Sequence, residues 1–138
     1  MNTHHGDTEA RSSSGLLSEA LTEAIIGAAI EVHSQLGPGL LESVYEECMR
    51  QELQIRDVPF KAQVDLPIIY ESRKTAGVYR IDLIVADEVV VELKPVERLL
   101  RVHQAQLLTY LKLVGKRVGL LINFNVPVLH RRILRRVL

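Results

Sequence analysis

The sequence has little of several features that mark large classes of protein. Its 138 residues include one cysteine, Cys48, which excludes an intrachain disulfide and a cysteine-rich zinc site. No apolar run approaches the roughly 20 residues that span a bilayer, and Met1–Gly15 lacks the apolar core of a signal peptide. We therefore expect a cytoplasmic protein without a membrane partner.

Charge of one sign and aromatic side chains are also scarce. The formal net charge is zero, so any binding of nucleic acid must come from a local patch rather than from a global attraction. Aromatic residues make up 4% of the chain. Neither property indicates a strong general affinity for nucleic acid.

What is present is the composition of a globular domain. Hydrophobic residues make up 47% and charged residues 25%, which is near the globular average. A chain of 138 residues fits one domain with a moderate core. Residues 1–16 are polar and lack periodicity, so we expect a flexible N-terminal tail there and a single domain over residues 17–138.

Three segments carry apolar residues at helical spacing. The predicted helices span residues 18–36, 41–56 and 102–114. Gly37-Pro38-Gly39 ends the first and Gly115 caps the third, because glycine caps helix C-termini and proline cannot continue a helix. On the second helix we expect Val44, Cys48 and Leu53 to face partly inward.

Apolar, β-branched runs predict the strands. These runs span residues 60–70, 78–85, 89–94 and 118–124. Pro67 marks the first as an edge strand or the place of a bulge. His130–Leu138 has arginines at helical spacing, yet its length and β-branching favour a final strand. The segment 89–124 has the length of a crossover, so its two strands could be parallel. The order predicts a mixed α/β or α+β sheet with helices packed on its faces.

Two adjacent predicted strands carry charged residues among apolar ones. Asp82 lies on one, and Glu92 and Lys94 lie on one face of the next because side chains alternate along a strand. If a three-residue loop joins the strands, Val85 pairs with Val89 and Asp82 lies directly opposite Glu92. Like charges so placed are destabilising. A hard divalent cation, which takes oxygen ligands, is one reason for them to coexist.

This set of residues suits the hydrolysis of a phosphodiester bond. Two carboxylates can bind Mg²⁺, which retains waters and can also bind a phosphate oxygen. The metal would lower the pKa of a bound water and stabilise charge on phosphorus, while Lys94 could orient the attacking water or stabilise that charge. The plain alternative is that Glu92 and Lys94 form the solvated face of an antiparallel strand.

The sequence around these residues resembles a known family. Asp82 followed by Glu92-Leu93-Lys94 is similar to the core of the PD-(D/E)XK nuclease superfamily, although Ile81 stands where its name has proline. Gly39-Leu40-Leu41-Glu42-Ser43-Val44-Tyr45 resembles the signature of the GxxExxY proteins, a prokaryotic group of that superfamily. The further segments that resemble this group are Gly27–His33, Leu36–Gly39, Gln106–Leu111 and Gly119–Phe124.

The resemblance implies a restriction-endonuclease-like core, a mixed central sheet flanked by helices. It implies Mg²⁺ or Mn²⁺ as the cofactor, DNA or RNA as the partner, and the homodimer in which many nucleases of this superfamily work. It implies metal binding by Asp82, Glu92 and Glu42, and catalysis by these acids together with Lys94.

The resemblance extends to the helix after the lysine strand. Gln106 and Tyr110 match polar residues of that helix, and residues four apart share a helix face. His103 joins this face, which could approach a phosphate backbone and bind substrate. Two basic clusters, Arg73-Lys74 and Arg131–Arg136, could also contact phosphate, although such clusters are usually solvated.

Structural readings of the same residues stay open. Glu42 suits the first turn of a helix through the helix dipole, and Tyr45 reads as a packing residue with a bonded hydroxyl. Gln106 and Tyr110 could be structural, and His103 an exposed helix residue. The alternative function is a non-catalytic nucleic-acid-binding or protein-interaction module that retains the nuclease fold.

Overall fold

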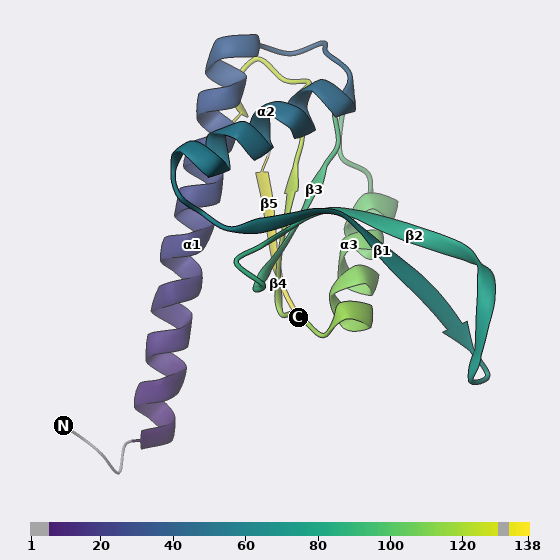
Figure 1. Cartoon of the computed structure of the whole chain (residues 1–138). Coiled ribbons are helices and arrows are strands. Elements are labelled where there is room, and N and C mark those ends of the chain that lie inside the picture. The colour runs from purple at the N-terminus through teal and green to yellow at the C-terminus, as the bar shows by residue number, and fades with distance from the viewer. Residues whose placement is uncertain (1–5, 130–132) are drawn as a thin grey trace.

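A computed structural model, which describes residues 6–129 and 133–138, contains a five-stranded sheet with helices on both faces (Figure 1). The strands lie in the order β1-β2-β3-β4-β5, and every neighbouring pair is antiparallel except β3 and β4, which are parallel. The elements are α1 (Gly6–Leu36), α2 (Glu42–Ile55), β1 (Phe60–Tyr70), β2 (Arg73–Val85), β3 (Val89–Leu93), α3 (Arg101–Val114), β4 (Val118–Ile122) and β5 (Ile133–Val137). This confirms the predicted mixed sheet flanked by helices.

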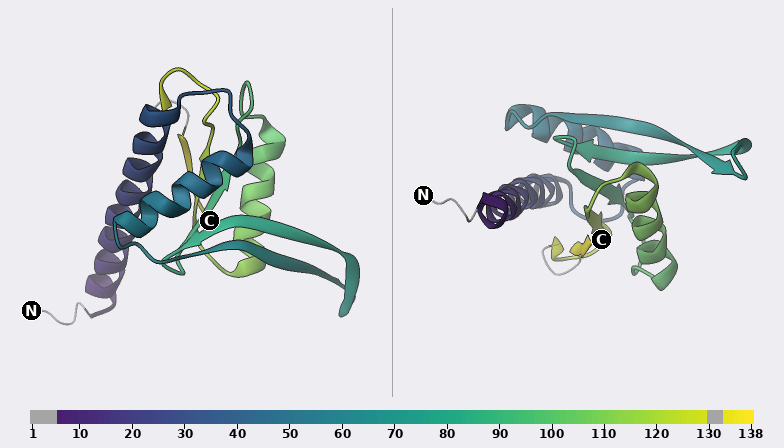
Figure 2. Two further views of the ribbon diagram at one scale, coloured as in Figure 1. Left: turned by 45° about the horizontal axis from the view of Figure 1, so that its top comes forward. Right: turned by 90° about the horizontal axis from the view of Figure 1, so that it is seen from below.

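The sheet separates two hydrophobic clusters because side chains alternate along each strand. Val91 and Leu120 face α1 and α2, whereas Val90 and Leu121 face α3. Figure 2 shows these helices on opposite sides of the strands. All residues of β3 and β4 are buried. Two covered faces explain why both strands read as continuous apolar runs in the sequence.

Most predicted boundaries agree with the structure to within one or two residues. β1 has the predicted bounds and lies at the edge of the sheet, and its pairing with β2 shifts register after Pro67. Both readings of that proline are therefore confirmed. Gly115 caps α3 in the left-handed conformation, with φ of 71°. The tail forms β5, as favoured; Arg131 and Arg132 lie outside the described residues.

Three local predictions were wrong. α1 begins at Gly6 rather than near Ser18, because a nucleated helix extends at the small cost of one fixed residue per added hydrogen bond. β2 begins at Arg73, since its ladder with β1 continues to the Tyr70–Arg73 pair. Val44 is 37% exposed, because α2 turns Tyr45 and its neighbours toward the sheet instead. The tail and domain boundary at residue 16 stays a prediction.

The β1–β2 hairpin is much longer than β3 and extends past the rest of the sheet (Figures 1 and 2). Its base packs beside α2 and α3, and its far end reaches away from both. Among the described residues, no helix combines the length and hydrophobicity needed to span a bilayer.

Candidate active site

The two acids predicted to oppose each other lie where the ladder between β2 and β3 ends. Val85 pairs with Val89, as predicted, and the last pair of the ladder is Leu83 with Val91. One step further, Asp82 and Glu92 are only 6% and 3% exposed. A solvated strand face therefore does not describe Glu92.

The carboxylates of these acids replace the ladder hydrogen bonds at this point. The Asp82 backbone N–H donates to Glu92 Oε2 at 2.9 Å, and the Leu93 N–H donates to Asp82 Oδ2 at 2.8 Å. Each acid thus binds the backbone of the opposite strand. This arrangement lets β2 leave β3 and continue with β1 as the projecting hairpin (Figure 1).

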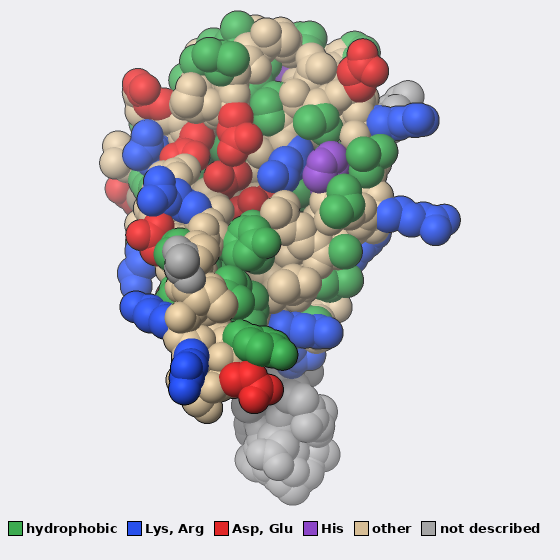
Figure 3. All heavy atoms as spheres, turned by 90° about the vertical axis from the view of Figure 1, so that its right-hand side faces the viewer, with side chains coloured by type: hydrophobic (Ala, Val, Ile, Leu, Met, Phe, Trp, Pro, Cys, Tyr) green, Lys and Arg blue, Asp and Glu red, His purple; other side chains and the backbone are tan. Residues whose placement is uncertain are grey.

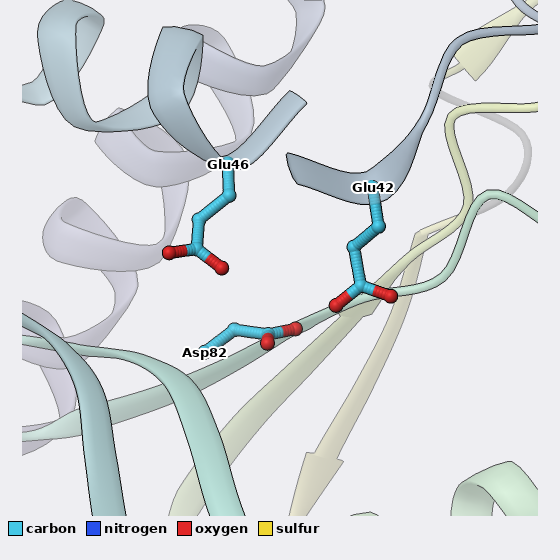
Figure 4. A group of neighbouring side chains, drawn as sticks. All are labelled: Glu42, Glu46 and Asp82. Atoms are coloured by element: carbon cyan, nitrogen blue, oxygen red, sulfur yellow. The ribbon is translucent and has the colours of Figure 1, made fainter. Parts of the chain in front are cut away.

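The first turns of α2 bring two further carboxylates to Asp82. Ligand atoms of Glu42, Glu46 and Asp82 all lie within 4.8 Å of one another. In Figure 4 the side chains of Glu42 and Glu46 extend from α2 toward the Asp82 carboxylate. Glu42 was expected near this site, whereas Glu46 was missed. The signal for Glu46 was its spacing, because residues four apart share a helix face.

Burial and the charges of neighbouring carboxylates raise the pKa values of Glu46, Asp82 and Glu92. Burial raises the pKa of Asp82 to about 6, and the nearby Glu42 carboxylate adds to that effect, although the Leu93 N–H opposes it. Burial, with the charge of Asp82, raises the pKa of Glu92 to about 8. The pKa of Glu46 is also raised, first by burial and then by Asp82. Lys94 lowers the pKa values of Asp82 and Glu92, so its ammonium lies close enough to stabilise both carboxylates.

Backbone contacts fix the segment that carries Lys94. The Lys94 N–H donates to the Ile122 carbonyl of β4 at 2.8 Å. Oδ1 of the fully buried Asn123 accepts the Val96 N–H at 3.1 Å and the Asn125 N–H at 2.9 Å. The side-chain amide Nδ2 of Asn123 is buried without a hydrogen-bond partner in the described part of the chain. The end of β4 thus anchors the turn that presents the lysine.

Gln63 on β1 is a second residue that the sequence reasoning missed. The β1–β2 pairing steps from Ala62–Leu83 to Val64–Ile81, so Gln63 and Asp82 lie between the two pairs. Gln63 has φ of 53°, and its amide donates to Glu46 Oε1. Because this contact depends on the irregular backbone at Gln63, the alternation of side chains along a regular strand gave no sign that a β1 side chain reaches α2.

Tyr45 fixes the loop between α1 and α2 beside these acids. Its hydroxyl donates to the Gly37 carbonyl at 2.6 Å and accepts the Leu40 N–H at 3.1 Å. Its ring is fully buried and stacks on Phe124 with centroids 4.5 Å apart. The expected hydrogen-bonded hydroxyl is confirmed. By holding the loop that precedes α2, Tyr45 fixes the position of the start of the helix and of Glu42 on it.

The three substrate-binding candidates lie on α3, in different settings. Tyr110 is 4% exposed, and burial together with Glu92 raises its pKa to about 12, which places its hydroxyl near the acids. His103 Nδ1 accepts the Leu100 N–H at 3.0 Å, a capping contact at the start of α3. Gln106 is half-buried on the same helix. Contact of these three side chains with substrate stays a prediction.

The donor set fits a hard divalent cation. Mg²⁺ and Mn²⁺ prefer carboxylate oxygens, and Glu42, Glu46 and Asp82 offer one each within a shared volume. Lys94 stabilises the charge of Asp82, and Arg50 that of Glu46, yet the pKa values of both acids stay raised by burial, so a bound cation would stabilise their ionised forms further. In Figure 3 acidic side chains gather in the middle of one face, with basic and histidine side chains beside them.

A mixed sheet with opposed acids and a lysine at the end of a short strand defines a nuclease-type domain. A family model described as the PD-(D/E)XK nuclease superfamily matches residues 19–137. The chain belongs to the PD-(D/E)XK nuclease superfamily. Comparisons with curated proteins and with solved structures gave no match. The predicted superfamily and its restriction-endonuclease-like fold are confirmed, and nucleases of this superfamily generally use divalent metals on nucleic acids.

Proposed function

We propose that this protein is a Mg²⁺- or Mn²⁺-dependent nuclease that hydrolyses phosphodiester bonds of DNA or RNA. The observation that carries the proposal is the convergence of Glu42, Glu46 and Asp82 beside buried Glu92 and Lys94. The two acids of α2 are far in sequence from Asp82 and Glu92. Folding them into one place leaves buried carboxylates that a cation would stabilise.

The residues of the chain have distinct roles in this proposal. Glu42, Glu46 and Asp82 would hold the metal, with Glu92 beside them. The bound ion would supply a water of lowered pKa and stabilise charge on phosphorus. Lys94 donates hydrogen bonds to the attacking water or to a phosphate oxygen, and its ammonium favours charge that develops in the transition state. Burial of Glu46, Asp82 and Glu92 keeps bulk water from these three carboxylates and strengthens their charge interactions, whereas Glu42 lies on the solvent side of the group.

The direct test is cleavage of labelled DNA and RNA in Mn²⁺ by the whole protein and by Lys94→Ala. We expect the substitution to lower the cleavage rate at least about 100-fold, as loss of a group that stabilises transition-state charge does. Lys112→Ala is the matched control, because Lys112 is exposed at the far end of α3. Equal rates for wild type and Lys94→Ala would contradict the role of the lysine.

The competing function is a non-catalytic binding module that retains the fold. Metal titration separates it from the nuclease. A catalytic site binds Mn²⁺, and Asp82→Asn weakens that binding. No binding at millimolar Mn²⁺ would favour the module.

We also infer that the chain is a GxxExxY protein and could act as a homodimer. The motif from Gly39 to Tyr45 supports the group assignment. Its glutamate, Glu42, lies beside Glu46 and Asp82, and its tyrosine, Tyr45, fixes the preceding loop. The homodimer rests on the superfamily alone. Light scattering of the purified protein tests it.

A further inference from the structure

The outer hairpin, residues 65–80 of β1 and β2, exposes large apolar side chains along most of its length, although Leu66 near its base belongs to the buried cluster that faces α3. Its strands remain paired to Tyr70 and Arg73 next to the turn. The exposed fractions are 57% for Ile69, 71% for Tyr70, 56% for Val78 and 51% for Tyr79. Exposed apolar side chains on a projecting β-ribbon favour aggregation, so a binding role is the better explanation for them.

The outer hairpin is continuous with the acidic site. The rings of Tyr79 and Tyr110 lie 5.8 Å apart. Tyr110 in turn lies near Glu92, whose charge adds to the effect of burial in raising the pKa of the tyrosine. Figure 3 looks at the hairpin end-on and shows hydrophobic side chains from just below the acidic group down to the hairpin end. A molecule bound along this surface would therefore end at the acids.

Two basic side chains and one acidic side chain, Glu71, are exposed at the far end of the outer hairpin. Arg73 and Lys74 are exposed there, next to the turn. Arg80, nearer the base, is paired with Asp65 at 2.8 Å. The hairpin thus offers cations at its end, exposed tyrosine rings along its length and the candidate metal ligands at its base.

We propose that the outer hairpin binds an unpaired nucleic-acid strand and leads it to the acidic site. Bases stack on Tyr70 and Tyr79, and phosphates pair with Arg73 and Lys74. This inference rests on the proposed nuclease function. An unpaired strand is the occupant that fits, because stacking on exposed rings needs free base faces, and aromatic side chains beside basic ones are the usual platform for single strands.

The proposal is tested by measuring binding in EDTA, which removes the metal and so prevents cleavage. The probe is a fluorescent oligothymidylate of about 20 nucleotides, and its binding is measured by fluorescence anisotropy. The single strand is compared with the duplex that it forms with oligoadenylate. We expect tighter binding of the single strand. Tyr70→Ala and Tyr79→Ala should each weaken it about tenfold, whereas Tyr70→Phe, which retains the ring, should bind as the wild type does. Tyr70 makes the cleaner variant because it is 71% exposed.

The salt dependence tests the phosphate contacts. Replacing Arg73 and Lys74 together by serine should reduce the slope of log affinity against log salt by about 1.4, since each phosphate contact with a single strand contributes about 0.7. The matched control replaces Arg117 and Lys112 by serine. Arg117 precedes β4, at the end of the strands opposite to Lys94.

The outcomes separate this inference from the proposed function. Unchanged single-strand affinity in Tyr70→Ala, equal affinity for the duplex, or no binding by the wild type would overturn the inference, even if the protein cleaves in Mn²⁺. A change of oligomeric state in Tyr70→Ala would assign the hairpin to a second copy and also overturn it. Ring-dependent binding without cleavage in Mn²⁺ would support the hairpin and contradict the nuclease.

Discussion

Gln63 adopts a backbone conformation that a residue within a β-strand seldom adopts. Its φ of 53° is left-handed, which costs an L-residue other than glycine about 1–2 kcal/mol. This conformation directs the Gln63 amide to Glu46, to which it donates a hydrogen bond. Strained residues of this kind gather at functional sites, where the surroundings hold them in place.

Substitution of Gln63 tests whether its side chain contributes to metal binding. Gln63→Gly removes both the backbone strain and the hydrogen bond, so we expect a free energy of unfolding within about 1 kcal/mol of wild type but weaker Mn²⁺ binding, because Glu46 loses its partner. Calorimetric titration and thermal unfolding measure the two effects. Ser72→Gly is the control, since Ser72 is also left-handed, with φ of 62°, in the hairpin turn. Unchanged metal affinity in Gln63→Gly would contradict a positioning role.

Glu46 itself provides a second prediction for a single residue. Glu46→Gln should lower Mn²⁺ affinity at least about tenfold, because it removes one charged ligand of the acidic group. Glu47→Gln changes the same charge at the exposed neighbouring position and should have no effect. Titration calorimetry distinguishes the two. Equal losses would indicate a general charge effect rather than coordination.

At the scale of elements, the position of α2 decides whether a site exists. The first two turns of α2 face Asp82 within β2 (Figure 4). The loop after α1 determines this position, and Tyr45 binds that loop at Gly37 and Leu40. The helix packs through Tyr45, Met49 and Leu53, a face that Val44 does not share.

Tyr45→Phe should test this role. Loss of the hydroxyl leaves the Gly37 carbonyl and the Leu40 N–H without their partner, so we expect the free energy of unfolding to fall by about 1 kcal/mol. Mn²⁺ affinity should fall as well, because the start of α2 loosens. Denaturant unfolding and metal titration measure both. Tyr70→Phe removes an exposed hydroxyl and should change neither.

At the scale of the whole molecule, the fold encloses carboxylates at some cost in stability. Folding raises the pKa of Asp82 to about 6 and that of Glu92 to about 8. The folded protein therefore binds more protons than the unfolded chain between about pH 4 and pH 8. The contribution of these acids is fully present below pH 4 and is lost as the pH rises through the folded-state values.

This linkage predicts opposite effects of pH and metal. In EDTA the wild type should lose stability relative to Glu92→Gln as the pH rises from 5 to 8, since glutamine has no proton to release. Mn²⁺ should raise the unfolding temperature more at pH 8 than at pH 5, because it binds the ionised acids. Thermal unfolding at both pH values checks this. A metal effect independent of pH would contradict binding by these carboxylates.

Much of this site could be predicted from sequence because its information is local. Asp82, Glu92 and Lys94 lie on strands joined by a short loop, and register follows from loop length. The Gly37–Gly39 break and the apolar run of β4 are local signals of the same kind. The superfamily was predicted from such segments and is confirmed by the match over residues 19–137.

The sequence by itself thus determined the element order, the hairpin register and the opposed acids, since each depends on neighbouring residues. Only the tertiary structure decided which long-range partners meet. It placed Glu46 and Gln63 at Asp82, buried Tyr45 against Phe124 and left the outer hairpin exposed. Helical spacing puts Glu46 on the same face of α2 as Glu42, but it does not say what that face meets. That depends on how the helices cross the sheet and how far β2 departs from β3, which contacts between distant parts of the chain decide.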